Sequence, residues 1–240
     1  ANFKCLISDA PIHGDYIKAE GKAGKIGSSL LAIVVAGARE RVYLSPTKEI
    51  EEIAHNVDHS WEPNVEFFQK ALGFRIGNYG LTKWSDLFTK RQLLALSTIS
   101  DLIQEVVTIA TNDASASGFE IEEKLEKGGT GALAYAQTVS IYLAFALDRC
   151  ADFSNAVTRW SPSNEKVMNL FGKQAIPMTW DYPEAGILAN TVGGFAPATE
   201  FISKCIRKLS GGAKGTAIQA DAQSQGLSKN QFISTDPPYY

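Results

Sequence analysis

The residues Asp236, Pro237, Pro238, Tyr239 and Tyr240 carry the most specific chemical signal in this sequence. A carboxylate at Asp236 can accept one hydrogen of an amino group, and the carbonyl oxygen of Pro237 can accept the other. Proline has a fixed φ and no N–H donor, so Pro237 and Pro238 hold that carbonyl stiffly. Together the two acceptors favour a pyramidal nitrogen whose lone pair points at an electrophile. The pattern predicts a site that activates an aromatic amino group by positioning it.

An aromatic ring at Tyr239 fits this site, because it gives an extruded nucleobase a face to stack on. Tyr240 is a second candidate contact to the substrate. The preceding residues, 232–235, are apolar and β-branched, which predicts a strand that ends at Asp236. The alternative is a proline-rich tail after a last strand, which is common at domain ends. A short motif stays a hypothesis until its structural context agrees.

Length and composition are those of an ordinary globular chain with one large domain or two small ones. The sequence has 240 residues, of which 45% are hydrophobic and 20% are charged. A net charge of −3 gives no overall basic character, which argues against a free-standing nucleic-acid binder. The sequence has no apolar run of about 18 residues and no signal-peptide pattern. We therefore expect a cytoplasmic protein without a membrane partner.

The cysteines and histidines do not predict a metal site. Cys5, Cys150 and Cys205 are isolated, so the sequence has neither a disulfide framework nor a C-x-x-C pair. His55 and His59 are four positions apart, but no second pair of ligands accompanies them. Buried free thiols and a solvated helix end are the expected roles.

Residues 1–80 are interpreted as a small β-rich lobe. Residues 29–35 are a buried-strand candidate, and a turn leads from them to residues 41–44, so a hairpin is expected. Residues 45–47 cap a short helix over residues 48–55, whose first turns are acidic.

Residues 81–153 are interpreted as a helical insertion. Thr89 is a suitable N-cap for a helix over about residues 90–112, and a second long helix is expected over about residues 130–152. Both helices have an apolar face, so they should pack against each other or against a sheet. The glycine-rich turn at 128–131 is interpreted as a helix entry, with an anion cradle as the alternative.

Residues 154–240 have an α/β pattern. The expected elements are helices over residues 164–171 and 197–209 and short strands over residues 216–221 and 231–235. Each strand has an acidic residue at its carboxyl end, Asp221 or Asp236. Because ligands bind outside the carboxyl ends of strands in open α/β sheets, Asp221 is a candidate for facing a cofactor.

Five stretches spread over the chain carry a resemblance to a known family. They are residues 16–24 (YIKAEGKAG), 86–93 (DLFTKRQL), 142–149 (YLAFALDR), 180–184 (WDYPE) and 234–240 (STDPPYY). In this order they resemble the prokaryotic DNA adenine methylases that carry a domain of unknown function at their N-terminus and often lie beside anti-phage defence genes. The resemblance implies a class I methyltransferase fold, which is α/β, with S-adenosylmethionine as methyl donor and DNA adenine as target.

The chain departs from this family in two places. It has no strand followed by a Phe-x-Gly-x-Gly-like turn, which forms the cofactor loop, so we expect an interior fragment that does not methylate alone. Where relatives often have a zinc-ribbon-like C-x-x-C, residues 5–8 read CLIS. One cysteine cannot hold a metal, so that site is expected to be degenerate.

The resemblance implies an adenine-specific, site-specific DNA methyltransferase with a partial catalytic segment in this chain. The expected site residues are Asp236, Pro237, Pro238 and Tyr239 for catalysis, Asp221 for the cofactor, and Tyr240, Trp180, Asp181 and Arg91 for the substrate. The alternative for Arg91 is an ordinary surface position at the start of a helix.

A second hypothesis is a non-catalytic DNA-binding or scaffold module of a phage-defence system. In that case the inserted helices recognise DNA or a defence partner protein, and the terminal motif is vestigial. A homodimer formed through an unpaired strand edge is a further expectation under either hypothesis.

Overall fold

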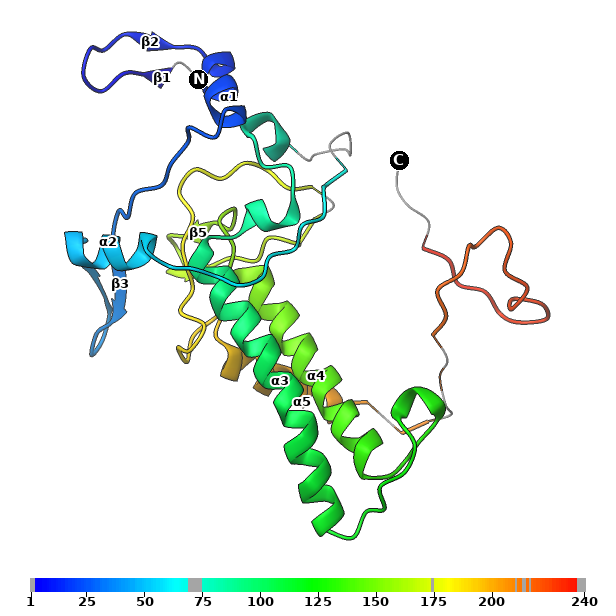
Figure 1. The fold of residues 1–240 in the computed structure, drawn as a ribbon. Helices are drawn as coiled ribbons and strands as arrows, with labels where there is room; N and C mark the ends of the chain where they lie inside the picture. Colours follow the sequence, from blue (N-terminus) through cyan, green and yellow to red (C-terminus); the bar gives the residue numbers. More distant parts are fainter. Residues whose placement is uncertain are drawn as a thin grey trace. The chain divides into compact units, whose positions relative to one another are not determined.

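The computed structural model describes residues 3–68, 75–173, 175–209, 211–212, 215 and 217–236. The chain divides into two compact units, Ala1–Ile206 and Arg207–Tyr240. The boundary between the units lies at the end of the last helix, at Ile206. The domain boundaries expected near residues 80 and 153 stay predictions. Figure 1 traces the elements along the chain.

The first unit begins with two antiparallel hairpins, each followed by a short helix. The hairpins pair β1 (Phe3–Lys4) with β2 (Pro11–Ile12) and β3 (Ile33–Ala36) with β4 (Arg41–Leu44), and the helices are α1 (Gly14–Lys22) and α2 (Lys48–His55). The predicted hairpin between residues 29–35 and 41–44 is confirmed as the pair of β3 and β4. The expected buried strand over residues 29–35 is wrong, because β3 is shorter and Val34 and Val35 are each 38% exposed. A two-stranded hairpin has no second layer to cover its faces.

Threonine N-caps begin α2 and α3 (Lys90–Ala116) at the predicted positions. The Thr47 hydroxyl accepts a hydrogen bond from Ile50 N at 3.4 Å, and the Thr89 hydroxyl accepts one from Gln92 N at 3.3 Å. In turn, Gln92 Oε1 accepts a hydrogen bond from Thr89 N at 2.9 Å. Thr89 and Gln92 therefore satisfy two N–H groups reciprocally, as in a capping box.

Replacing Thr89 by alanine removes this cap and is expected to lower the free energy of unfolding by about 1 kcal/mol. Urea denaturation measures the change. The matched control is Thr108→Ala at an exposed position inside the same helix, where alanine is the better helix former. Equal stabilities of the two variants would show that Thr89 does not cap α3 in solution.

A long α-helical hairpin is the largest feature of the first unit. In Figure 1, α3 lies along α4 (Ala132–Phe153), and α5 (Phe195–Ile206) packs against α4. The two expected long helices and their apolar faces are confirmed, although α3 extends to Ala116, beyond the expected end near residue 112. Buried positions of the two helices include Leu93, Ile99, Ile103, Ala132, Ala136, Ala146 and Cys150.

Within the described part of the chain, α3 is the one helix that is long and apolar enough to cross a membrane by length and composition. A single helix of this kind is weak evidence, because core helices of soluble proteins pass the same test. Here α3 packs along α4 and exposes the charged residues Asp101 and Glu105. The cytoplasmic location stays a prediction.

The helix expected over residues 164–171 is wrong. These residues include β6 (Lys166–Val167), which pairs antiparallel with β5 (Trp160–Ser161). Glu165 has a φ of 45°, a left-handed conformation that a helix interior does not contain. Val167 and Leu170 are buried, as their apolar side chains predict, but they lie in a hairpin strand and in a loop instead of in a helix.

The strands expected over residues 216–221 and 231–235 are also wrong, as far as the structure describes them. Residues 217–236 form turns and irregular segments without strand pairing. A strand needs a hydrogen-bonding neighbour, and Phe232 and Ile233 are exposed at 108% and 64% instead of packed in a sheet. The α/β class therefore stays a prediction from the sequence, and the strand edge invoked for a homodimer is missing from these residues.

A small hydrophobic core holds the loops of the first unit together. It includes Ile76 from the 3₁₀ helix η1 (Ile76–Tyr79) and Leu87 from the 3₁₀ helix η2 (Trp84–Leu87), both fully buried. Their buried neighbours are Phe67, Val157, Leu170 and Ile176. Met178 packs against this cluster, so the core lies next to the stretch that begins at Trp180.

Candidate functional site

The segment of residues 180–184 is fixed by contacts with distant parts of the chain. The ring of Trp180 packs edge to face on Tyr79, with ring centroids 5.1 Å apart and an interplanar angle of 84°. The carbonyl of Pro183 accepts a hydrogen bond from Thr158 Oγ1 at 3.3 Å. A segment without strand pairing, which bends at Trp180 and Asp181, is therefore held at both ends by contacts with side chains.

Arg91 is bound by protein groups on two sides. Its Nη2 lies 2.8 Å from Glu184 Oε2, and its Nε donates to the same oxygen at 3.0 Å. Its Nη1 donates a hydrogen bond to the carbonyl of Ala54 in α2. Because its side chain is only 32% exposed, the guanidinium serves mainly to join α2, α3 and the segment of residues 180–184. Direct contact between Arg91 and a substrate stays a prediction.

Tyr182 lies partly buried beside this ion pair. Burial raises the pKa of Tyr182, a hydrogen bond with Ser28 opposes the rise, and the charges of Glu184 and Arg91 act in opposite directions. The phenol therefore stays protonated at neutral pH and keeps its O–H as a donor. Sequence reasoning missed Tyr182 and Ser28 as members of the site. The available signal was the position of Tyr182 inside the WDYPE stretch.

The outer side of the segment presents an aromatic ring and a carboxylate to solvent. Trp180 is 50% exposed although Tyr79 supports its ring, and Asp181 is exposed next to it. A supported indole offers a flat surface on which a nucleobase can stack, and a carboxylate can accept hydrogen bonds from a base amino group. Three of the predicted substrate residues thus belong to one part of the first unit. Trp180 and Asp181 lie in the segment of residues 180–184, and Arg91 is bound to that segment through Glu184.

Two glycines allow α1 to pack directly on the turn that contains Tyr79. Gly80 has a φ of +94°, and a Cβ added to it would lie 2.3 Å from the carbonyl oxygen of Gly21. A Cβ on Gly21 would lie 2.5 Å from the carbonyl oxygen of Tyr79. Backbone therefore touches backbone here, so that α1 supports Tyr79 and Tyr79 supports Trp180.

Replacing Gly80 by alanine is expected to lower the free energy of unfolding by about 1–3 kcal/mol, with the steric clash adding to the strain of a positive φ. The matched control is Gly118→Ala, because Gly118 has a φ of +95° but no atom within 4 Å of the added Cβ. Urea denaturation of both variants separates the clash from the strain. Equal losses would mean that α1 does not pack against Gly80 in solution.

The terminal motif belongs to the second unit. Asp236 is exposed, and no strand ends at it within residues 217–236. The expected strand tip is therefore wrong as far as the structure describes this region. Pro237, Pro238, Tyr239 and Tyr240 lie outside the described residues, so their roles and that of Asp236 stay predictions.

Asp221 begins a turn. Its Oδ1 accepts a hydrogen bond from Gln223 N at 2.8 Å, and its carbonyl oxygen accepts one from Gln225 N at 3.0 Å. This is the local side-chain bonding by which aspartate favours turns. The expected position at the end of a strand is wrong, and a contact with the cofactor stays a prediction.

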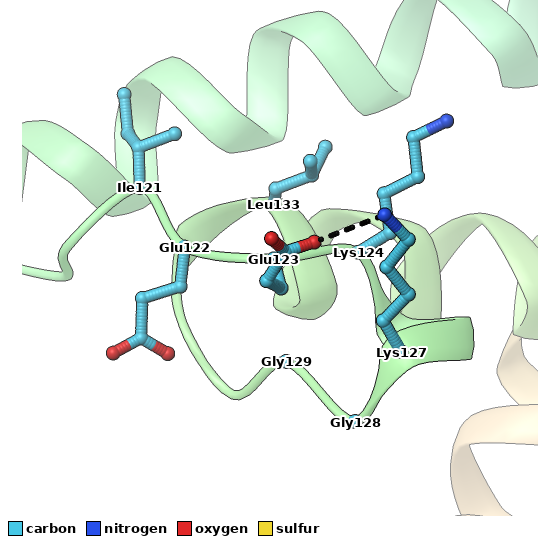
Figure 2. A pocket seen from close by; sticks show the side chains of 8 residues that line it. All are labelled: Ile121, Glu122, Glu123, Lys124, Lys127, Gly128, Gly129 and Leu133. Carbon is cyan, nitrogen blue, oxygen red and sulfur yellow. Dashed lines mark ion pairs between the residues drawn. The ribbon is translucent and has the colours of Figure 1, made fainter.

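The glycine-rich turn before α4 is occupied by the protein's own backbone. Ala132 N donates to the carbonyl oxygen of Glu120 at 2.8 Å, and a Cβ on Gly131 would lie 2.2 Å from that oxygen. A shallow cavity of about 730 Å³ lies beside the turn, where Figure 2 shows Glu123 paired with Lys127 at 3.5 Å. The lining contains two glutamates and two lysines, so it has no net charge that would attract an anion, and the backbone contacts of the turn favour the helix-entry interpretation over an anion cradle.

The thiols differ in their surroundings. Cys150 is buried as expected, whereas the expectation is wrong for Cys205, which is exposed. Hydrogen bonds from the Ser8 side chain and from the N–H groups of Ser8 and Ile7 lower the pKa of Cys5. Within the residues that the structure describes, no group of His, Cys, Asp and Glu side chains is arranged to hold a metal ion.

Comparison with known proteins does not assign a family. No family model, curated protein or solved structure matched the chain. The resemblance therefore rests on the five stretches of sequence. Two of them, residues 86–93 and 180–184, are joined directly by the ion pair of Arg91 with Glu184, and a third, residues 16–24, lies through Gly21 against Tyr79, whose ring contacts Trp180.

Proposed function

We propose that this chain is part of a site-specific DNA methyltransferase that methylates the amino group of adenine. The observation that carries the proposal is the run Asp236, Pro237, Pro238, Tyr239, whose acceptors and ring suit an adenine amino group. The exposure of Asp236 is compatible with this role, because a base must reach the carboxylate.

In the proposed mechanism the chain positions the amino group. The Asp236 carboxylate and the Pro237 carbonyl each accept one hydrogen of the adenine amino group, which turns the nitrogen lone pair outward. Tyr239 stacks on the extruded base and holds it in that orientation. Acceptors fixed before the reaction need no reorganisation when charge develops on the nitrogen, which lowers the barrier.

In this proposal the chain holds S-adenosylmethionine only in part. The sequence lacks the glycine-rich loop after a strand, and Asp221 begins a turn instead of ending a strand. S-adenosylmethionine would supply the methyl group from a binding site formed largely by other parts of the complete methyltransferase.

The first unit has a DNA-recognition role in this proposal. Trp180 and Asp181 are exposed on a segment that the ion pair of Arg91 with Glu184 and the ring of Tyr79 hold in place. Stacking on an aromatic ring tolerates any base, whereas a carboxylate selects bases with an amino group. The unit would therefore contact unstacked bases of the DNA.

One observation favours the alternative, a non-catalytic DNA-binding or scaffold module of a phage-defence system. In the described residues every named strand belongs to one of three two-stranded antiparallel sheets. These hairpins are not the open parallel sheet at whose strand ends a class I methyltransferase binds its ligands. Under this alternative, the surface at Trp180 binds DNA or a defence partner protein, and the terminal motif has no role.

A methyl-transfer assay separates the two functions. The complete gene product is incubated with tritiated S-adenosylmethionine and DNA that lacks methylated adenine, and the digested nucleosides are separated by chromatography. The proposal expects label in N6-methyladenine. DNA binding that Trp180→Ala abolishes, without label in any base, would support the non-catalytic module.

A further inference from the structure

A second, more enclosed cavity lies between α4 and α5, and none of residues 180–184 lines it. It has a volume of about 210 Å³. Most of its lining side chains are apolar, namely Cys150, Phe153, Val192, Pro197, Ala198 and Phe201. Pockets for drug-sized ligands have volumes of about 300–1,000 Å³, so this cavity suits a smaller molecule.

The turn before α5 builds one wall of this cavity by close packing. Gly193 has a φ of +93°, and a Cβ added to it would lie 2.5 Å from Ala185 Cβ and 3.3 Å from Phe153 Cβ. A Cβ on Gly194 would lie 1.9 Å from the carbonyl oxygen of Ala189. Only glycines permit this approach, so the wall is formed by tightly placed backbone.

Arg149 brings a positive charge into this apolar cavity. Its guanidinium carbon lies 4.0 Å from the ring centroid of Phe201 and 5.4 Å from that of Phe153. Contact with the ring faces leaves the five N–H donors of the guanidinium available in its plane. Among the described residues, none supplies a carboxylate or carbonyl acceptor to these donors.

The remaining polar groups of the cavity are electrically balanced. Lys204 Nζ lies 2.7 Å from Glu200 Oε1, so these two charges offset each other. Burial raises the pKa of the Cys150 thiol to about 11, which keeps it neutral. Arg149 is therefore the uncompensated charge of the cavity lining and favours an anion. The carboxylate of Glu200 would oppose a dianion more than a monoanion.

We propose that this cavity binds a small organic carboxylate with a compact apolar or aromatic body. The carboxylate accepts two parallel hydrogen bonds from Arg149, a geometry that the planar guanidinium matches. The apolar body displaces water from the walls that Phe153 and Phe201 form. This site is independent of DNA methylation and stands whether or not that function is correct.

Benzoate is the probe for this site, and benzamide is its neutral isostere. Both are titrated into the full chain and followed by ligand-observed NMR. Benzoate is expected to bind at least about tenfold more tightly than benzamide, because its carboxylate forms charge-assisted hydrogen bonds with Arg149 and the neutral amide of benzamide does not. Arg149→Met keeps an apolar stem on Phe201 and removes the charge, so it should weaken benzoate binding by a similar factor.

Two further variants complete the test. Val192→Trp places a large ring at a partly exposed lining position and should block benzoate without burying a new group in the core. Arg39→Met removes a charge from the exposed turn between β3 and β4 and should leave binding unchanged. Circular dichroism identifies the folded variants.

The proposal is overturned if benzoate does not bind the wild-type chain, if benzamide binds as tightly, or if folded Arg149→Met binds benzoate normally. If Arg149→Met does not fold, benzoate binding by Val192→Trp tests the site instead. Normal benzoate binding by that folded variant would place the ligand elsewhere and reject the site.

Discussion

Replacing Asp236 by alanine is expected to lower the rate of methyl transfer by the complete gene product about 10²–10³-fold, the loss seen when one preorganised hydrogen-bonding group is removed from a transition state. The alanine variant cannot accept a hydrogen of the adenine amino group, so the nitrogen lone pair is no longer held outward. Stacking on Tyr239 and contacts with the first unit remain, so the loss should appear in kcat and not in the KM for DNA.

Two matched variants show whether the loss of rate in Asp236→Ala comes from the missing hydrogen-bond acceptor. Asp236→Asn keeps a carbonyl acceptor of the same shape and should retain part of the activity. Asp58→Ala removes an exposed carboxylate of the first unit and should be as active as the wild type. Wild-type rates in Asp236→Ala would refute the catalytic assignment.

Replacing Leu87 by alanine is expected to lower the free energy of unfolding of the first unit by about 2–5 kcal/mol, from lost transfer energy and the cavity left behind. Leu87 is fully buried in the loop core, and its carbonyl accepts a hydrogen bond from Ala156 N at 2.6 Å. A cavity there also loosens Ile176, which lies in the same cluster just before the segment that contains Trp180.

The matched control for this variant is Leu102→Ala. Leu102 is 51% exposed in the middle of α3, so its replacement should change stability by only about 0.5 kcal/mol. Urea denaturation followed by tryptophan fluorescence measures both variants. Similar losses in the two would show that the loop core around Leu87 is not formed in solution.

The helices α2, α3 and α4 are the part of the fold that the sequence predicts well, because their signals are local. Thr47 and Thr89 each begin a helix at the predicted residue, and a capping bond needs only residues of the first turn. The apolar faces of α3 and α4 also follow from spacing alone, since a helix repeats its faces along one segment.

The strands were predicted poorly, because a strand is stabilised by a partner that local sequence does not specify. The apolar residues before Asp236 have the composition of a strand, yet Phe232 and Ile233 are exposed and unpaired with any strand in the described second unit. At residues 164–171 the expected helix is likewise replaced by pairing with a strand, because β6 pairs with β5 and Glu165 has a positive φ.

The candidate site in the first unit was only partly predictable for the same reason. Trp180, Asp181 and Arg91 were among the substrate residues expected from the sequence, but the partners of Trp180 and Arg91 come from remote positions. Tyr79 meets Trp180 across about 100 positions of the sequence, a contact that no helix or strand periodicity encodes. The sequence shows that residue 80 is a glycine, but only the structure shows that its backbone packs against Gly21.

The most direct test of the account is the structure of the complete gene product bound to DNA and an unreactive analogue of S-adenosylmethionine. The distance to measure joins a carboxylate oxygen of Asp236 to the amino nitrogen of the extruded adenine. We predict a hydrogen-bond distance of about 2.7–3.2 Å. An adenine that stays stacked in the duplex, or that lies in a pocket out of reach of Asp236, would contradict the account.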